Sequence, residues 1–312
     1  MVNCKICNLG FDTDKSLHSH LRAHKTTMCE YYQTQYPRHD KYSGDLINFK
    51  NKEQYFATDF NNKGNLKSWL KNQTSVSQKE FMLSFMKDRI QKKGIKYSPS
   101  FIELKTLMCP PLTYYHLIFG NYYEFCSGLG LMNRFSYPKD SSIFQATAQL
   151  VNPVIYCDTR EQNPLKFNLP SERRTVKSGD YCFNNPAGNG RIVFERKSLC
   201  DLIGTLSSGY DRFKREIERI NQAGQNLVII VEQNLEESLN FNKNHNISKF
   251  SKRVSPDFIF HKVRELTQGY DFIQFLFVNG RKESSRVIEK VYSTTVDWLS
   301  FDLQLLYHLS IL

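Results

Sequence analysis

Three charged residues close an apolar segment in the second half of the chain. Residues 191–202 read RIVFERKSLCDL, so Glu195, Arg196 and Lys197 directly follow three apolar residues. Burying an unpaired charge costs several kcal/mol per ion, so this cluster requires ion partners, a metal or a substrate. In a strand, residues i and i+2 share a face. We therefore expect Glu195 and Lys197 on one face and Arg196 on the other.

A hairpin is expected to bring a further carboxylate to this cluster. Asp180 stands in a predicted strand at 174–183, and the turn-rich segment NNPAGNG at 184–190 predicts the connecting loop. Asp180 should then lie beside Glu195, with Lys197 on the same face. Two carboxylates that hold Mg²⁺ and an ammonium that orients or deprotonates a water are what metal-dependent phosphodiester hydrolysis requires.

The elements around these residues predict an α/β sandwich. Hairpin-linked strands come first, followed by alternating helices and strands, which indicates helices packed on a sheet. The expected order is a strand that ends at Asp158, the hairpin strands, a helical segment over 199–220 interrupted near Gly209, a strand at 226–233, a helix near 256–268, a strand near 271–278 and helical sequence from about 281. The last residues, 295–312, are expected to form one apolar helix.

This region resembles the nuclease domain of the XPF-type (ERCC4-domain) structure-specific endonuclease family, over roughly residues 151–295. The motifs that carry the resemblance are Asp158-Thr-Arg160-Glu161, Gly179-Asp180 and Glu195-Arg196-Lys197-x3-Asp201. The resemblance implies a restriction-endonuclease-like core with Mg²⁺ or Mn²⁺ as cofactor. It implies metal ligation by Asp180 and Glu195, catalysis by Lys197, supporting roles for Asp158 and Asp201, and a phosphate contact or an acidic partner for Arg196. Family members usually carry tandem helix-hairpin-helix repeats after the nuclease, for which the segment after residue 295 is too short.

The first residues have the spacing of a metal site. Residues 4–24 read CKICNLGFDTDKSLHSHLRAH. Two thiolates (Cys4 and Cys7) and two imidazoles one helical turn apart (His20 and His24) make a tetrahedral zinc site. The segment resembles the two-Cys, two-His zinc finger family, which implies a ββα fold with Phe11 and Leu17 as its small core. The base-contacting helix positions of such fingers fall on Thr13, Ser16 and Ser19, which favours backbone docking or a protein contact over sequence readout.

The middle of the chain is expected to hold a connecting region and a small helical domain. Residues 29–75 are rich in Tyr, Lys and Asn, and EYYQTQYPRHDKYSGD is predicted to be turn-prone. Its aromatic residues either stack on bases or cover a small core. Residues 76–135 predict three helices: one that ends at Gly94, one capped by Ser98 with Pro99 in its first turn, and one that starts near Thr113.

The helical region resembles the repeat that accompanies homing endonucleases. The matching marks are Ser98-Pro99, Phe119-Gly120 and Gly128-Leu129-Gly130-Leu131. This resemblance implies DNA binding, with phosphate contacts from Lys87, Arg89, Lys92, Lys93 and Lys96. A merely solvated basic face is the alternative.

Composition agrees with a partner of negative charge. The 312 residues carry a net charge of +11, concentrated in the first half, which suits nucleic acid. The chain shows no signal peptide or apolar membrane span, and its eight cysteines are not spaced as a disulfide framework. We therefore expect an intracellular protein of a reducing compartment, cytoplasm or nucleus, that is not secreted and does not bind membranes. The predicted domains are a zinc finger at 1–28, the connecting region at 29–75, the helical domain at 76–135 and the nuclease domain at 150–312.

The predicted function is Mg²⁺-dependent DNA endonuclease activity of DNA-repair type. Two substrates stay open: forks and flaps cut by a structure-specific enzyme, or a long duplex site cut by a homing-like enzyme. The expected partners are DNA and a second copy or partner subunit bound through the nuclease domain. The alternative is a non-catalytic DNA-binding scaffold with a retired nuclease fold.

Overall fold

The chain folds into two compact units. The computed structural model describes residues 2–39, 46, 70, 73–107, 109–138, 141–145, 153–184, 188–243 and 254–312. One unit comprises Met1–Met82 and Met108–Pro110, and the other Leu83–Leu107 and Pro111–Leu312. Most of the connecting region predicted at 29–75 and the centre of the NNPAGNG loop lie outside the described residues.

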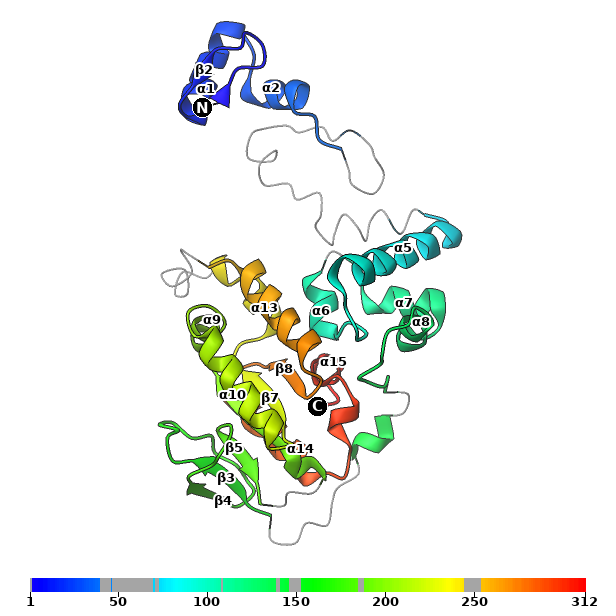
Figure 1. Cartoon of the computed structure of the whole chain (residues 1–312), viewed down its shortest axis with the longest axis vertical. Coiled ribbons are helices and arrows are strands. Elements are labelled where there is room, and N and C mark those ends of the chain that lie inside the picture. The colour runs from blue at the N-terminus through cyan, green and yellow to red at the C-terminus, as the bar shows by residue number, and fades with distance from the viewer. Residues whose placement is uncertain are drawn as a thin grey trace. The chain divides into compact units, whose positions relative to one another are not determined.

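A small ββα module opens the first unit. Its elements are the antiparallel strands β1 (Val2–Asn3) and β2 (Gly10–Phe11), helix α1 (Asp14–His20), a 3₁₀ turn (Leu21–His24) and helix α2 (Met28–Gln35) (Figure 1). The turn-prone structure predicted for residues 30–35 is wrong. A capping box between Thr27 and Glu30 starts α2 there, and α2 buries Tyr31 against the module.

A six-stranded mixed sheet forms the centre of the second unit. Its strand order is β4-β3-β5-β6-β7-β8, with β5 antiparallel to both its neighbours and the remaining pairs parallel. The strands are β3 (Ile155–Asp158), β4 (Ser171–Arg174), β5 (Tyr181–Phe183), β6 (Ile192–Lys197), β7 (Asn226–Val231) and β8 (Ile273–Phe277). The single strand predicted at 174–183 is wrong, because Gly179 turns the backbone with a φ of 68° immediately before β5.

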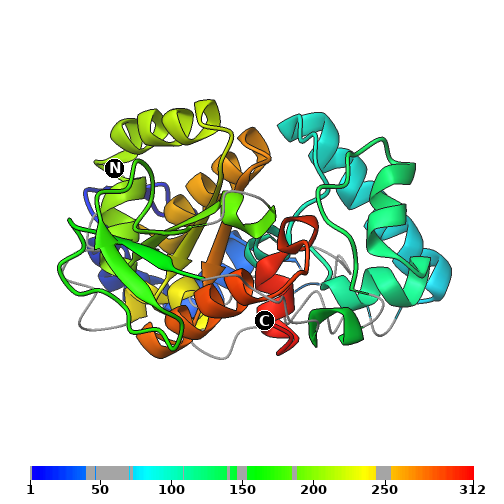
Figure 2. The ribbon, with the colours of Figure 1, turned by 90° about the horizontal axis from the view of Figure 1, so that it is seen from below.

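Helices cover both faces of this sheet, as the alternating pattern predicts. Helices α9 (Leu199–Leu206), α10 (Tyr210–Gln222) and α13 (Pro256–Gly269) pack on one face, and α14 (Arg281–Ser293) packs on the other (Figure 2). The break between α9 and α10 falls at the predicted Gly209. The short helix α11 (Leu235–Leu239) follows β7, and 3₁₀ turns occupy Ser141–Gln145, Gly188–Arg191 and Phe241–Lys243.

The helical region holds α5 (Ser75–Lys93), α6 (Phe101–Thr106), α7 (Leu112–Phe119) and α8 (Tyr122–Gly128). The predicted cap at Ser98 is wrong. Ser100 caps α6 instead, because its hydroxyl accepts from the N–H of Glu103 while the Glu103 carboxylate accepts from the N–H of Ser100. Ser98 is buried, and its backbone N–H donates to the carbonyl of Met132.

Residues that flank these helices bind directly to the sheet unit. The Arg134 guanidinium donates to three main-chain carbonyls, those of Thr267, Asp271 and Ile273. The buried Asp302 carboxylate accepts a 2.6 Å hydrogen bond from the N–H of Phe101. Helix α6 is therefore anchored to the body that carries the sheet.

The end of the chain protects the edge strand β8. A 3₁₀ turn (Trp298–Ser300) and helix α15 (Leu303–His308) replace the single apolar helix predicted at 295–312, which is wrong, because Asp302 interrupts the segment as the cap of α15. The Gln304 side chain both accepts from the N–H and donates to the carbonyl of Phe277. It thereby satisfies an edge that would otherwise be open to strand pairing. Among the described helices, none is long and apolar enough to cross a membrane.

Candidate active site

The carboxyl end of β6 carries the predicted charged cluster. Lys197 Nζ lies 2.9 Å from Glu195 Oε1, and the two side chains are only 11% and 14% exposed. The Lys197 ammonium also lies 5.5 Å from the centre of the Phe213 ring on α10. Alternation along β6 therefore places Glu195 and Lys197 together on the face that α9 and α10 cover, as predicted.

Asp180 reaches the same strand end from β5. Its N–H donates to the carbonyl of Phe194 (2.7 Å), and its Oδ2 accepts from the N–H of Arg196 (2.7 Å). These two bonds fix the carboxylate beside β6, next to Glu195, where the hairpin argument predicts it. Gly179 permits this approach, since a Cβ there would lie 2.9 Å from the carbonyl oxygen of Phe194.

The electrostatics of this face disfavour a second negative charge. Burial and the neighbouring Glu195 carboxylate raise the pKa of Asp180 to about 7, although the Arg196 N–H and the Lys197 ammonium act in the opposite direction. Ionisation of both adjacent carboxylates becomes favourable when one cation binds the two of them. Their hard oxygen donors match Mg²⁺ or Mn²⁺, so the residues present fit a divalent ion of this class.

Arg196 points to the opposite face and forms a closed ion-pair network. Its guanidinium pairs with Glu161 at 2.8 Å and with both oxygens of Glu232 at 3.0 Å. The three side chains are between 11% and 13% exposed. The Arg196 guanidinium thus has acidic partners here, one of the two contacts that the resemblance implies.

Asp158 lies beside this network at the end of β3 and is 1% exposed. Its carboxylate accepts three hydrogen bonds from Arg160, one from the backbone and two from the guanidinium. The Arg160 guanidinium holds the pKa of the Asp158 carboxyl below its usual range. Asp201 lies elsewhere, exposed in the first turn of α9, where Ser198 donates to it at 2.6 Å.

Two acidic residues of the site were missed by the sequence reasoning. Glu232 directly follows β7, and the same rule that singled out Glu195, a charge at the end of an apolar strand, would have found it. Glu216 lies on α10, three residues after Phe213, and burial together with the Glu195 carboxylate raises its pKa. Its spacing from Phe213 is the one available signal, because it turns Glu216 toward the same side of the helix.

The first unit gathers its four predicted metal ligands. One ligand atom each from Cys4, Cys7, His20 and His24 lies within 4.8 Å of the others. The Nε2 atoms of the two histidines are 3.0 Å apart, and the Sγ–Nε2 distances are 3.2 and 3.5 Å. Bonds of about 2.0–2.3 Å in a tetrahedral zinc site produce similar separations. The residues therefore fit Zn²⁺.

Helix α2 supports the ββα module that carries these four residues, which we call the zinc module. The Tyr31 hydroxyl accepts from the N–H of Lys5 at 2.9 Å, and the Tyr32 hydroxyl lies 2.9 Å from His18 Nε2. The ring of Tyr31 joins Leu17 and Leu21 in the buried core of the module. Helix α2, which follows the predicted finger, is therefore packed against it.

Comparisons with known proteins identify one family domain in the chain. The family model described as the ERCC4 domain matches residues 157–291. Among solved structures, the chain is similar to XPF from Aeropyrum pernix (19% identity, TM-score 0.33) and to the same protein in complex with DNA (20% identity, TM-score 0.31). Each alignment covers 45% of this chain and 59% or 63% of the other, so it spans about three fifths of those proteins. No curated protein matches the chain.

The family match confirms two sequence expectations. One is the resemblance to XPF-type nucleases, and the other is the restriction-endonuclease-like α/β core. Residues 157–291 are an ERCC4 domain.

Proposed function

We propose that this protein is a Mg²⁺- or Mn²⁺-dependent DNA endonuclease. The observation that carries the proposal is the group formed by Asp180, Glu195 and Lys197 on one face of β6, inside an ERCC4 domain. Asp180 and Glu195 would hold the ion. When bound, the ion polarises the scissile phosphate and acidifies a water.

The chain's own residues supply the remaining parts of the reaction. Lys197 is a donor at the strand end, and its ammonium lies 2.9 Å from Glu195 and 5.5 Å from the centre of the Phe213 ring, a position from which it can hold the attacking water or a phosphate oxygen. The Arg196 network keeps β6 in place from the other face. The Asp158 side chain is held by Arg160, and its backbone N–H donates to the carbonyl of Asp180. Asp158 thereby connects the end of β3 to the start of β5.

A cleavage assay on labelled DNA with Mg²⁺ tests the proposal. Lys197→Ala should lower the single-turnover rate by about 10²–10⁴-fold, because a positioned proton-transfer group is lost, while DNA affinity stays within about twofold. Lys282→Ala is the matched control, since Lys282 is an exposed lysine on α14, across the sheet. Unchanged cleavage by Lys197→Ala would refute this active site. Tight binding without cleavage by the wild type would favour the scaffold alternative.

The substrate class is tested with a panel of forks, flaps, bubbles, single strands and plain duplex. Cleavage confined to branched substrates identifies a structure-specific nuclease. Cleavage of duplex at one locus identifies a homing-like enzyme. A second copy or a partner subunit bound through the ERCC4 domain is part of the same proposal, and light scattering with and without DNA measures it.

The zinc module and the helical region are proposed to bind DNA outside the active site. Lys87, Lys92, Lys93 and Lys96 are exposed, as phosphate contacts require. On the module, the hydroxyls at the base-contacting positions are engaged locally: Thr13 caps α1 and bonds Ser16, and Ser19 donates to Lys15. This agrees with docking on the DNA backbone rather than reading of bases.

Cys4→Ser tests the role of the zinc module. Loss of a ligand should release zinc and unfold the module, because the metal supplies most of its folding free energy. We expect DNA affinity to fall about tenfold or more while turnover on saturating DNA changes less than twofold. Cys29→Ser, on α2 and outside the ligand group, is the control. Unaltered affinity in Cys4→Ser would make the module a protein-contact unit.

A further inference from the structure

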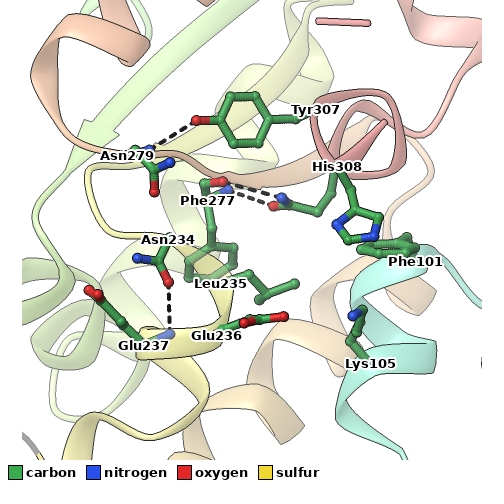
Figure 3. A pocket seen from close by; sticks show the side chains of 11 residues that line it. Phe101, Lys105, Asn234, Leu235, Glu236, Glu237, Phe277, Asn279, Tyr307 and His308 are labelled. Carbon is green, nitrogen blue, oxygen red and sulfur yellow. Dashed lines mark hydrogen bonds between the residues drawn. The ribbon is translucent and has the colours of Figure 1, made fainter. Parts of the chain in front are cut away.

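A cavity of about 460 Å³ opens beside the proposed active site. It lies at the carboxyl ends of β7 and β8, where ligands bind in open α/β sheets. Its volume falls in the range of about 300–1,000 Å³ that small-molecule sites occupy. Side chains from α6, α11, α15 and the turn after β8 surround it (Figure 3).

The cavity and the active site share one edge of the sheet. Glu232 ends β7 by pairing with Arg196, and Asn234, two residues later, lines the cavity. Strands β6 and β8 both neighbour β7, so their ends are about 10 Å apart at the usual strand spacing. A single polynucleotide can therefore occupy both places.

Much of the cavity wall comes from outside the ERCC4 domain. Phe101 and Lys105 belong to α6, and Tyr307 and His308 belong to α15, whereas the family match ends at residue 291. The cavity is thus built where the helical region and the chain end meet the nuclease core.

The lining combines an aromatic surface with converging polar groups. The rings of Phe101 and His308 lie 4.8 Å apart, and the Lys105 ammonium lies 5.4 Å from the Phe101 ring. Within the described part of the chain, no hydrogen bond engages the side-chain amide of Asn279, the Glu236 carboxylate or the Lys105 ammonium. These groups therefore offer a ligand both hydrogen-bond donors and hydrogen-bond acceptors.

The charges of the lining decide what class of ligand fits. The carboxylates of Glu236 and Glu237 would repel a simple anion, and the ammonium of Lys105 would repel a simple cation. A peptide strand has no open edge to extend, because Gln304 already bonds Phe277 on β8. A planar, neutral ring with both donors and acceptors on its edge satisfies aromatic, amide and carboxylate groups together, and a nucleobase has this chemistry.

We propose that this cavity is a subsite for one unpaired nucleobase of the DNA strand that the nuclease site engages. The base stacks on the exposed ring of His308, which packs on Phe101; its edge meets Asn279 and Glu236, and Lys105 faces the adjoining phosphate. Paired bases cannot enter, so the subsite selects DNA with an unpaired nucleotide near the cut. This inference rests on the proposed function, since it takes DNA as the substrate.

The test uses full-length protein and Mg²⁺-free buffer. A fork with 2-aminopurine at successive unpaired positions near its junction is titrated, and stacking in the cavity should quench one position at least threefold. The double variant His308→Ala/Asn279→Ala should lose that quenching and bind the fork about tenfold more weakly, as expected for one lost stacked base. Phe101 is buried and is left intact. His261→Ala, an exposed histidine on α13, is the control.

A fork that is abasic at the quenched position separates base recognition from general binding. Wild type should bind it as weakly as the double variant binds the normal fork, and the double variant should not distinguish the two forks. Equal affinity of wild type for both forks overturns the subsite, even if the protein cuts DNA. Wild type that neither binds nor cuts any DNA overturns the proposed function instead, and the cavity proposal with it.

Discussion

The two faces of β6 hold charged residues in opposite ways. On one face, Arg196 is paired with Glu161 and Glu232, and nearly every donor of its guanidinium is used. On the other face, Glu195, Asp180 and Glu216 lie near the Lys197 ammonium, and burial together with the Glu195 carboxylate raises the pKa of Asp180 and of Glu216. The charges of the first face are paired within the chain, whereas the second face holds adjacent carboxylates whose repulsion a bound cation would relieve.

This contrast separates a structural from a chemical role for neighbouring residues of one motif. A buried pair that is already satisfied resists change, because removal of one partner leaves the other uncompensated. Adjacent carboxylates that repel each other in the metal-free protein are suited to bind a cation. Adjacent residues of the Glu-Arg-Lys segment can therefore be tested independently, one for stability and the others for chemistry.

The largest effect on stability is expected from Arg196→Met. Loss of the guanidinium leaves Glu161 and Glu232 nearly buried without a counter-ion, which should lower the free energy of unfolding by about 3–5 kcal/mol. Urea unfolding of the full-length protein, followed in the unit that carries the six-stranded sheet, measures this loss. Lys92→Met is the control, because its pair with Asp88 is open to solvent, with 69% and 56% exposure, and should cost at most about 1 kcal/mol. Equal losses for both variants would contradict a structural role for the Arg196 network.

An intermediate effect is expected from Gly179→Ala. The added Cβ would lie 2.9 Å from the Phe194 carbonyl oxygen at a φ of 68°. Backbone strain and the clash together should cost about 2–4 kcal/mol and displace Asp180. Gly224→Ala is a matched control with a φ of 65° and open space around its Cβ. The difference in melting temperature between the two variants isolates the close approach, and equal losses would show that the contact with β6 is unimportant.

A further effect is a pH dependence that Asp180 introduces. In metal-free protein its folded pKa of about 7 lies above the usual 3.8, so the folded state binds more protons across that interval. The free energy of unfolding should therefore fall as pH rises from about 4 to about 7. Asp180→Asn should flatten this slope, and Asp201→Asn, at an exposed position, should not. Fluorescence of the buried Trp298 in a Trp69→Phe background reports the transition. A slope that persists in Asp180→Asn would contradict the strained carboxylate pair.

The local rules of strands explain what the sequence predicted at the site. Alternation alone places Glu195 and Lys197 opposite Arg196, and the hairpin brings Asp180 to them. The rule of a charge at the end of an apolar strand also singles out Glu232 after β7, but it cannot pair Glu161 and Glu232 with Arg196, because they come from different strands and only the strand order brings them together. Glu216 depends on how α10 is rotated against the sheet, which no local pattern fixes.

Most errors of the prediction occurred where two local signals compete. Ser98 and Ser100 both resemble helix caps, and the reciprocal bonds of Ser100 with Glu103 decide the choice. The turn formers of the predicted turn-prone segment begin at Pro37, whereas residues 28–35 hold none, and the capping box and the burial of Tyr31 favour a helix there. The apolar chain end is not one helix, because Asp302 and Gln304 interrupt it to bind Phe101 and β8.

The most direct measurement compares Lys197→Met with Arg196→Met in one experiment, by thermal unfolding and by single-turnover cleavage with Mg²⁺ at a temperature where both are folded. Lys197→Met removes the ammonium that pairs with the nearly buried Glu195, so it should also lose stability, but cleavage by the folded variant should fall at least about 100-fold. Arg196→Met should also lose stability, yet its folded fraction should retain cleavage, because its guanidinium lies on the other face of β6. Wild-type cleavage by Lys197→Met would contradict the assignment of the chemistry to this face of β6.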